Sequence, residues 1–306
     1  MKLLRVRIIS AKTCGGLLDE VQRSLRSPFG DYSTFDPLCL IGPNGAGKSQ
    51  FLQMIAEIFQ SAFYACIPEE ERVEGNPDLQ FEIEYFIYPE DSQPPVRVRI
   101  SREAIERKRP PLIVQRKEDY NWIDCDLSAP KTHALLPQKI VGYTSGDNET
   151  LSLPFLISRS GYADEVGSRA LDVSTRSQPV PDTRLMLIDY ETHLEVLVAN
   201  LLLGSESQRK ALLQEANLQD LHSFRCRIQL AHSAAPSASA RIKKQTGRKG
   251  VQLTEELETY IKQLQQCATC YKYDEKTETY IFDYWINDQT REAFRSFWGD
   301  ALNLYA

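Results

Sequence analysis

The fold of this 306-residue chain is predicted most directly from one stretch, Gly42-Pro43-Asn44-Gly45-Ala46-Gly47-Lys48-Ser49. The four residues before it, Leu38-Cys39-Leu40-Ile41, form a short apolar run that predicts a strand. After it, apolar residues recur at helical spacing, at Leu52, Ile55, Ala56 and Phe59. A strand, a G-x-x-x-x-G-K-S loop and a helix, in that order, are the context in which this pattern predicts a phosphate-binding loop.

The residue types in this loop suit the binding of phosphate. Glycine lets backbone N–H groups turn toward an anion without a clash from Cβ, and the positive end of the helix dipole points the same way. We expect Lys48 to reach the β- and γ-phosphates and the Ser49 hydroxyl to bind Mg²⁺. The sequence therefore predicts a site for ATP and Mg²⁺ made by Gly42, Pro43, Asn44, Gly45, Ala46, Gly47, Lys48, Ser49 and Gln50.

Composition and charge exclude several other classes of protein. Hydrophobic residues make up 42% of the chain and charged residues 25%, which excludes a wholly disordered protein. The formal net charge of −6 argues against a general attraction to nucleic acid, and no apolar run reaches the ~18 residues of a membrane span. Seven scattered cysteines, an odd number, favour a reducing compartment, so we expect a cytoplasmic protein without membrane contact.

The loop at 42–49, with the alternation of basic and apolar residues at 2–9, resembles the ABC-type ATPases of the SMC and RecF-like branch. Residues 142–155, 184–203, 267–270 and 282–287 are similar to the restriction-system-associated AAA-family ATPases of prokaryotic defence loci. The resemblance implies an α/β fold, a P-loop NTPase of ABC/SMC-head type with an antiparallel β subdomain and a helical insertion or arm. It also implies an inserted loop at 13–35, and a C-terminal lobe that would follow residue 306, so that this chain is the N-terminal part.

The resemblance implies two parts of the chain, and residue patterning predicts the elements within each. Residues 1–204 are expected to form the ATP-binding lobe, with strands of the β subdomain (78–127) at 79–88, 96–102, 112–117 and 121–127. Residues 205–306 are expected to form the insertion or arm, with a strand at 224–230, a helix at 253–266, a hairpin at 271–287 and a final helix at 291–304. Residues 233–250 read as a flexible basic loop, whose charges at 241–249 either contact nucleic acid or are simply solvated.

One candidate exists for the apolar strand and acidic pair that such ATPases use with the loop. The run from Arg184 to Ile188 leads to Asp189, which could hold Mg²⁺. Tyr190 takes the place of the usual adjacent glutamate, and Glu191 comes one residue later, which on a strand reverses the direction of the side chain. Asp189 and Glu191 are therefore the candidate catalytic residues. The alternative is that Asp189 caps the helix that follows.

The segment from Tyr143 to Glu149 follows a predicted strand at 139–142 and precedes a helical pattern. By resemblance, its position matches the segment that senses Mg²⁺ and the γ-phosphate in these ATPases, which makes Ser145 a candidate nucleotide contact. The other interpretation is a polar turn.

Two functions fit these observations. The first is an ATP-hydrolysing head that forms a homodimer or higher oligomer over bound ATP and regulates a nuclease effector, of HNH or restriction type, in anti-phage defence. The second is an ATP-binding scaffold or sensor without turnover of its own. A RecF-like ATPase of DNA repair or recombination is a further alternative.

Overall fold

The computed structural model describes residues 1–12, 14–30, 35–88, 94–104, 111–230 and 251–305. They divide into two compact units, Met1–Tyr162 with Pro181–Tyr190, and Ala163–Val180 with Glu191–Ala306. The architecture is mixed α/β with antiparallel sheets, in agreement with the α/β class predicted from the sequence. In these ranges no helix is long and apolar enough to cross a membrane. The predicted division at residue 204 into an ATP-binding lobe and an arm stays a prediction.

An antiparallel sheet of six strands forms most of the first unit. Its order is β2-β1-β3-β4-β5-β6, and the strands are β1 (Lys2–Ser10), β2 (Val21–Ser24), β3 (Gln80–Ile87), β4 (Val96–Arg102), β5 (Leu112–Glu118) and β6 (Asn121–Asp124). The four strands predicted between 78 and 127 are thus confirmed as antiparallel neighbours. Within the segment 13–35, which is predicted to be an inserted loop, residues 21–24 form a strand instead: β2 pairs with β1, Val6 opposite Arg23, while residues 13 and 31–34 lie outside the described residues.

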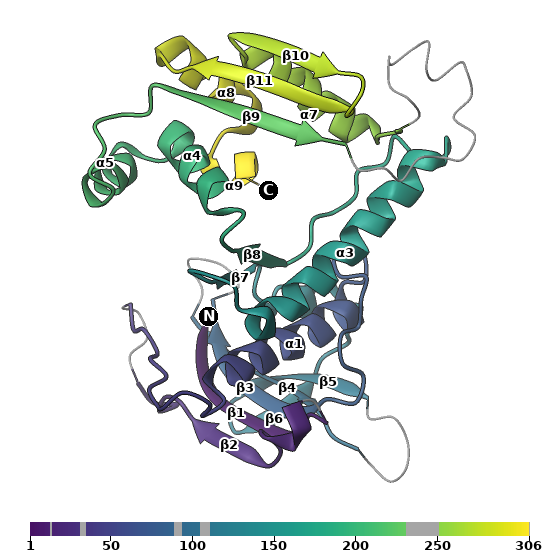
Figure 1. The fold of residues 1–306 in the computed structure, drawn as a ribbon. Helices are drawn as coiled ribbons and strands as arrows, with labels where there is room; N and C mark the ends of the chain where they lie inside the picture. The colour runs from purple at the N-terminus through teal and green to yellow at the C-terminus, as the bar shows by residue number, and fades with distance from the viewer. Residues whose placement is uncertain (13, 31–34, 89–93, 105–110, 231–250, 306) are drawn as a thin grey trace. The chain divides into compact units, whose positions relative to one another are not determined.

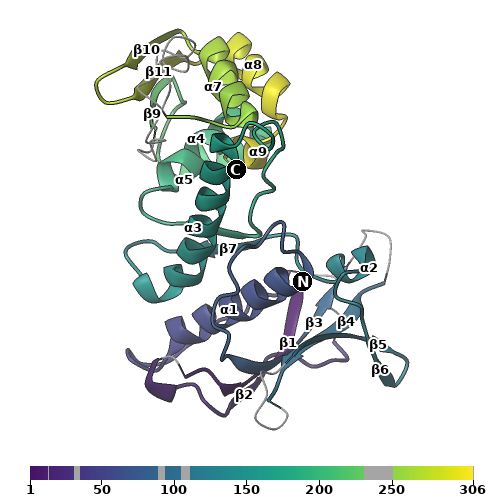
Figure 2. The same cartoon turned by 90° about the vertical axis from the view of Figure 1, so that its right-hand side faces the viewer.

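Helix α1 (Lys48–Cys66) covers one face of this sheet, as Figures 1 and 2 both show. Alternate residues of the strands point toward it, and Ile83 and Tyr85 are fully buried there. The ring centroids of Phe59 and Tyr85 lie 5.5 Å apart in an edge-to-face arrangement. Each fully buried side chain of this size contributes about 1.5–3 kcal/mol, so the sheet fixes the position of α1 and of the loop that precedes it.

The other face of the sheet carries charged side chains. Glu84 is 2% exposed and accepts hydrogen bonds from the guanidinium groups of Arg97 (2.6 and 3.2 Å) and Arg99 (2.7 and 3.1 Å). Burial tends to raise the pKa of Glu84, but the hydrogen bonds and charges of the two arginines outweigh it, and the pKa is lowered. The guanidinium of Arg99 lies 4.0 Å from the ring centroid of Trp122, which ties β6 to β4.

The apolar run Leu38–Ile41 is not a strand, so that prediction is wrong. Leu38 is 40% exposed and Ile41 is 95% exposed. An apolar run becomes a strand when a neighbouring edge takes up its N–H and C=O groups. Among the described strands, none pairs with these residues, and the chain enters the loop without regular secondary structure.

Two parallel strands complete the first unit, β7 (Ile140–Tyr143) and β8 (Leu185–Ile188). Gly142 lies opposite Leu187 in this pair, which confirms the strands predicted at 139–142 and 184–188. Residue 142 has to be glycine, because an added Cβ would lie 2.7 Å from the ring of Phe155. Phe155 belongs to α3 (Glu149–Leu171), which the two units share, and the short α2 (Pro130–His133) precedes β7.

The second unit is built around a three-stranded antiparallel sheet, in the order β10-β11-β9. Its strands are β9 (Ser223–Gln229), β10 (Cys270–Asp274) and β11 (Thr279–Trp285), which confirms the predicted strand and hairpin. Its helices are α4 (His193–Leu203), α5 (Glu206–Glu215), α7 (Glu255–Cys267), α8 (Asp288–Trp298) and α9 (Ala301–Tyr305). The single final helix predicted at 291–304 is interrupted, because the chain turns at Gly299 with a φ of 76°.

Candidate functional site

The glycine-rich loop (residues 42–49) turns tightly before α1. Gly45 and Gly47 both have a φ of 81°, in the left-handed region that favours glycine. The N–H of Ala46 donates to the carbonyl of Pro43 at 3.3 Å, and the N–H of Phe51 donates to the carbonyl of Gly47 at 2.8 Å. Gly47 is thereby the N-cap of α1, and the turn is fixed by its own backbone.

Lys48 bends back over the loop. Its Nζ donates to the carbonyl oxygens of Gly42 at 2.9 Å and of Pro43 at 2.8 Å. A cationic group is therefore held at the mouth of the loop by exposed, replaceable contacts. An anion bound there would compete with two neutral carbonyls for the ammonium group, and it would add the attraction between opposite charges to each hydrogen bond.

The first turn of α1 is free of features that would repel an anion. It contains no acidic residue, and no side chain caps it. The backbone N–H groups of a first turn have no partner within the helix, and the helix dipole adds partial positive charge to them. The N–H groups of this first turn are therefore available to an anion bound at the loop.

Asn148 joins the start of α3 to the start of α1. Its Nδ2 lies 3.5 Å from the Oγ of Ser49, 99 residues away in the sequence. Its Oδ1 accepts the N–H of Leu151 at 3.1 Å, and its carbonyl accepts the N–H of Ser152 at 3.0 Å, so Asn148 also caps α3. Sequence reasoning missed Asn148 as a site residue, although an asparagine directly before a helical pattern is a recognisable cap.

Ser145 lies in the bend between β7 and α3 and is exposed. Asn148, three positions further along the chain, is the residue of this segment that contacts the loop, through Ser49. The prediction that Ser145 contacts the nucleotide stays a prediction. Next to it, Thr144 is 5% exposed, and its Oγ1 is buried without a hydrogen-bond partner among the described atoms. A buried hydroxyl without a partner is unusual and marks this end of β7 as polar.

Asp189 follows β8 directly and is half-buried. The N–H of Thr144 donates to the carbonyl of Ile188 at 3.0 Å, so the ends of β7 and β8 lie side by side. Ligands of α/β proteins characteristically bind at the carboxyl ends of parallel strands. Asp189 therefore lies at the carboxyl ends of β7 and β8. From this end of β7 the chain continues to Asn148.

Glu191 is exposed, in the turn between Asp189 and Thr192, and it belongs to the second unit. Thr192 is the N-cap residue of α4. In the described part of the chain, no three or more His, Cys, Asp or Glu side chains gather in a group that could hold a metal ion.

Two buried carboxylic acids support α1 behind the loop. Glu57 is 6% exposed and accepts a hydrogen bond from Gln53 Nε2 at 2.7 Å. Glu71 is fully buried and accepts hydrogen bonds from the Ser158 hydroxyl and, at 3.2 Å, the Val73 N–H. Burial raises the pKa of both side chains, more than their hydrogen bonds lower it.

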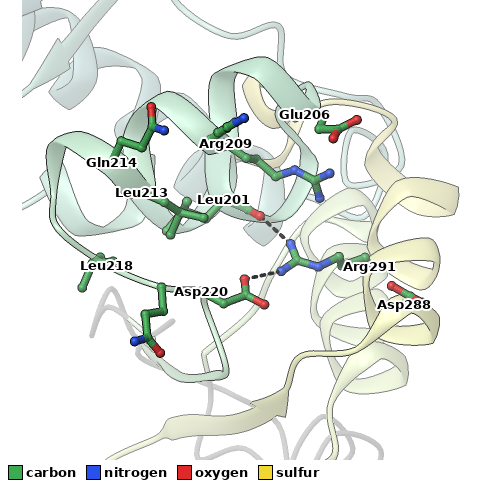
Figure 3. Close-up of a pocket in the computed structure, with 11 residues that line it drawn as sticks. Leu201, Glu206, Arg209, Leu213, Gln214, Leu218, Asp220, Asp288 and Arg291 are labelled. Carbon is green, nitrogen blue, oxygen red and sulfur yellow. Dashed lines mark hydrogen bonds and ion pairs between the residues drawn. The ribbon is translucent and has the colours of Figure 1, made fainter.

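The second unit contains a separate hollow of about 590 Å³ between α5, α8 and the segment that follows α5 (Figure 3). Arg291 crosses it and donates to the Leu201 carbonyl at 2.5 Å and to Asp220 Oδ1 at 3.2 Å. Glu206 and Arg209 of α5 also line it. None of the site residues predicted from the sequence lines this hollow.

The basic segment 241–249, predicted as a possible contact to nucleic acid, lies outside the described residues, as does the whole loop 233–250. Comparison of the chain with protein-family models, with curated proteins and with solved structures found no match.

Proposed function

We propose that this chain binds ATP together with Mg²⁺ at the glycine-rich loop. The observation that carries the proposal is the arrangement of Lys48, Ser49 and Asn148: a cation over the loop, a hydroxyl in the first turn of α1, and an amide from a second helix within 3.5 Å of that hydroxyl. If the Gly-Lys-Ser sequence occurred here by chance, there would be no reason for the residue that caps α3 to contact its serine.

The loop residues have separable tasks in this proposal. The N–H groups of the loop and of the first turn of α1 hold the β-phosphate, because they face outward at the positive end of the helix dipole. Lys48 transfers its hydrogen bonds from the carbonyls of Gly42 and Pro43 to the β- and γ-phosphate oxygens.

The donor set fits Mg²⁺. Mg²⁺ prefers oxygen ligands and usually keeps several waters, so one or two protein oxygens suffice beside the phosphates. The Ser49 hydroxyl has two lone pairs, and the contact from Asn148 Nδ2 uses one of them. Asp189 supplies a carboxylate at the ends of β7 and β8. When bound, the ion would neutralise phosphate charge, and Asn148 would orient the hydroxyl that holds it.

The wider function of the proposal rests on the family resemblance. In it, the chain is part of an SMC-like ATPase head that dimerises over ATP, hydrolyses it, and regulates a nuclease effector of anti-phage defence. Nucleotide-dependent association of two heads would be a two-state switch, since bound ATP supplies charge at the interface and hydrolysis removes it.

A second candidate is an ATP-binding scaffold that does not hydrolyse the nucleotide. The residue beside Asp189 favours it: Tyr190, which is 74% exposed, takes the position of the usual glutamate, and Glu191 comes one residue later. A general base must lie within hydrogen-bond reach of the attacking water, and a tyrosine does not supply the carboxylate that the ATPase uses at this position.

Binding is tested by titrating ATP and Mg²⁺ into the purified chain. We expect Lys48→Ala to abolish binding, whereas Lys210→Ala, which removes an exposed lysine of the second unit, leaves it unchanged. Absence of ATP binding by the unsubstituted chain would refute the proposal.

Turnover and association separate the two candidates. If phosphate release is measurable and is lost in the Asp189→Asn, Glu191→Gln double variant, the ATPase is supported. If ATP binds without turnover, the scaffold is supported. The mass of the particle in solution, with and without ATP, tests dimerisation, and a monomer in both conditions would contradict it.

A further inference from the structure

An exposed leucine lies against the glycine-rich loop. Leu17 is 53% exposed, whereas its neighbour Leu18 is 7% exposed. A Cβ placed on Gly47 would lie 3.4 Å from Cδ2 of both leucines, which is ordinary van der Waals contact. Leu17 therefore packs on the residue that caps α1 and keeps about half of its side chain open to solvent.

The turn that carries Leu17 is fixed to the sheet. Gly15 and Gly16 have φ values of 63° and 77°, which turn the chain sharply after β1. The N–H of Asp19 donates to the Gly16 carbonyl at 3.0 Å, and Asp19 Oδ1 accepts the N–H of Ala11 at 2.7 Å. Leu17 is thus an apolar group presented from a constrained turn and not from a loose end.

A nucleotide held by its phosphates must lay its base on the surface beside the loop. Contact with an apolar side chain stabilises a bound purine ring more than a pyrimidine ring, because the faces of a purine are broader and both are poorly hydrated. Other exposed apolar side chains near the loop in sequence are Leu38, Ile41 and Leu52. Leu38 and Ile41 belong to a segment without regular secondary structure or a strand partner among the described residues, and Leu52 lies a full turn into α1.

We infer that Leu17 is the contact surface for the nucleobase and that the site takes purine nucleoside triphosphates in preference to pyrimidine ones. The inference rests on the proposed function, since it places a base beside phosphates bound at the loop. An aliphatic side chain is stabilised by the area of the ring that it covers, and it makes no hydrogen bonds with the polar edge of that ring. Leu17 therefore favours ATP and GTP over CTP and UTP and does little to separate ATP from GTP.

The test compares ATP with inorganic tripolyphosphate, which has the phosphates and no base. We expect Leu17→Ala to weaken ATP binding about three- to ten-fold, in keeping with the loss of apolar contact area, and to leave tripolyphosphate binding unchanged. Leu17→Tyr, which offers a ring for stacking, should tighten ATP binding. Leu52→Ala is the matched control and should alter neither affinity.

Each outcome has a distinct meaning. If Leu17→Ala and Leu17→Tyr bind ATP as the unsubstituted chain does, the inference is overturned while nucleotide binding at the loop stands. If Leu17→Ala weakens tripolyphosphate and ATP equally, the leucine only supports the loop, and the inference is again overturned. If the unsubstituted chain binds neither ligand, the proposed function fails and the inference with it. Thermal unfolding of each variant establishes that it is folded.

Discussion

Asn148 Nδ2 lies 3.5 Å from Ser49 Oγ, and this contact joins the starts of two helices that are far apart in the sequence. Asn148 has a second task, since its Oδ1 caps α3 through the N–H of Leu151. The two tasks can be separated by substitution, because only the amide group supplies a donor on one side and an acceptor on the other.

We expect Asn148→Ser to keep the cap and lose the contact to Ser49. Serine caps helices about as well as asparagine, so the free energy of unfolding should change by less than about 1 kcal/mol. The affinity for ATP in the presence of Mg²⁺ should fall, while the affinity measured in EDTA should stay the same. Equal affinities for the variant and the unsubstituted chain in Mg²⁺ would show that Asn148 is only a cap.

The glycines of the loop should not tolerate a side chain. At a φ of 81°, alanine is strained by about 1–2 kcal/mol, so Gly45→Ala and Gly47→Ala should both lower the free energy of unfolding by that amount. The added Cβ of Gly47→Ala would lie 3.4 Å from Leu17 and Leu18, which is ordinary contact, so the two variants should cost about the same. Urea denaturation measures both. Gly146→Ala, at a position with no atoms within 4 Å of the added Cβ, is the control and should be nearly neutral.

Glu84 should be important for the stability of the six-stranded sheet. Removing its charge leaves two guanidinium groups without their buried partner, which costs about 3–5 kcal/mol in a fully buried pair. Arg97 and Arg99 are 28% and 23% exposed, so we expect about 2–4 kcal/mol for Glu84→Gln, measured by denaturant unfolding. Glu82→Gln, on the same strand and 20% exposed, should cost less than about 1 kcal/mol; an equal loss in both variants would contradict the assignment.

The stability of the first unit should fall as pH rises through the raised pKa of Glu57. The pKa of Glu57 is higher in the folded chain than in the unfolded chain. Its contribution to the free energy of unfolding is therefore complete below about pH 4.3, the pKa of an unperturbed glutamate, and is lost as the buried carboxyl ionises at higher pH. Glu57→Gln, which stays neutral, should therefore gain stability relative to the unsubstituted chain between pH 4 and pH 8.

Thermal unfolding at the two pH values measures this gain. A Glu57→Gln variant whose difference in stability from the unsubstituted chain is the same at both pH values would place the carboxyl in contact with water.

Local patterns predicted much of the secondary structure correctly. Alternating apolar residues defined β1, β3 and β4, and helical spacing after Lys48 defined α1, because both periodicities follow from the geometry of one element. These patterns failed where pairing with a neighbouring strand decides whether a segment becomes a strand. Residues 21–24 carry little apolar pattern and still form β2 on the edge of β1, whereas the apolar run Leu38–Ile41 finds no neighbouring strand in the described structure.

The sequence by itself determined the glycine-rich loop, its lysine and its serine, since a turn with glycine at positive φ before a helix is a property of adjacent residues. Only the tertiary structure brought Asn148 to Ser49, aligned the ends of β7 and β8 beside Asp189, and placed Leu17 on Gly47. These contacts join residues from separate parts of the chain, and they exist because burial of the sheet against α1 fixes where each segment starts.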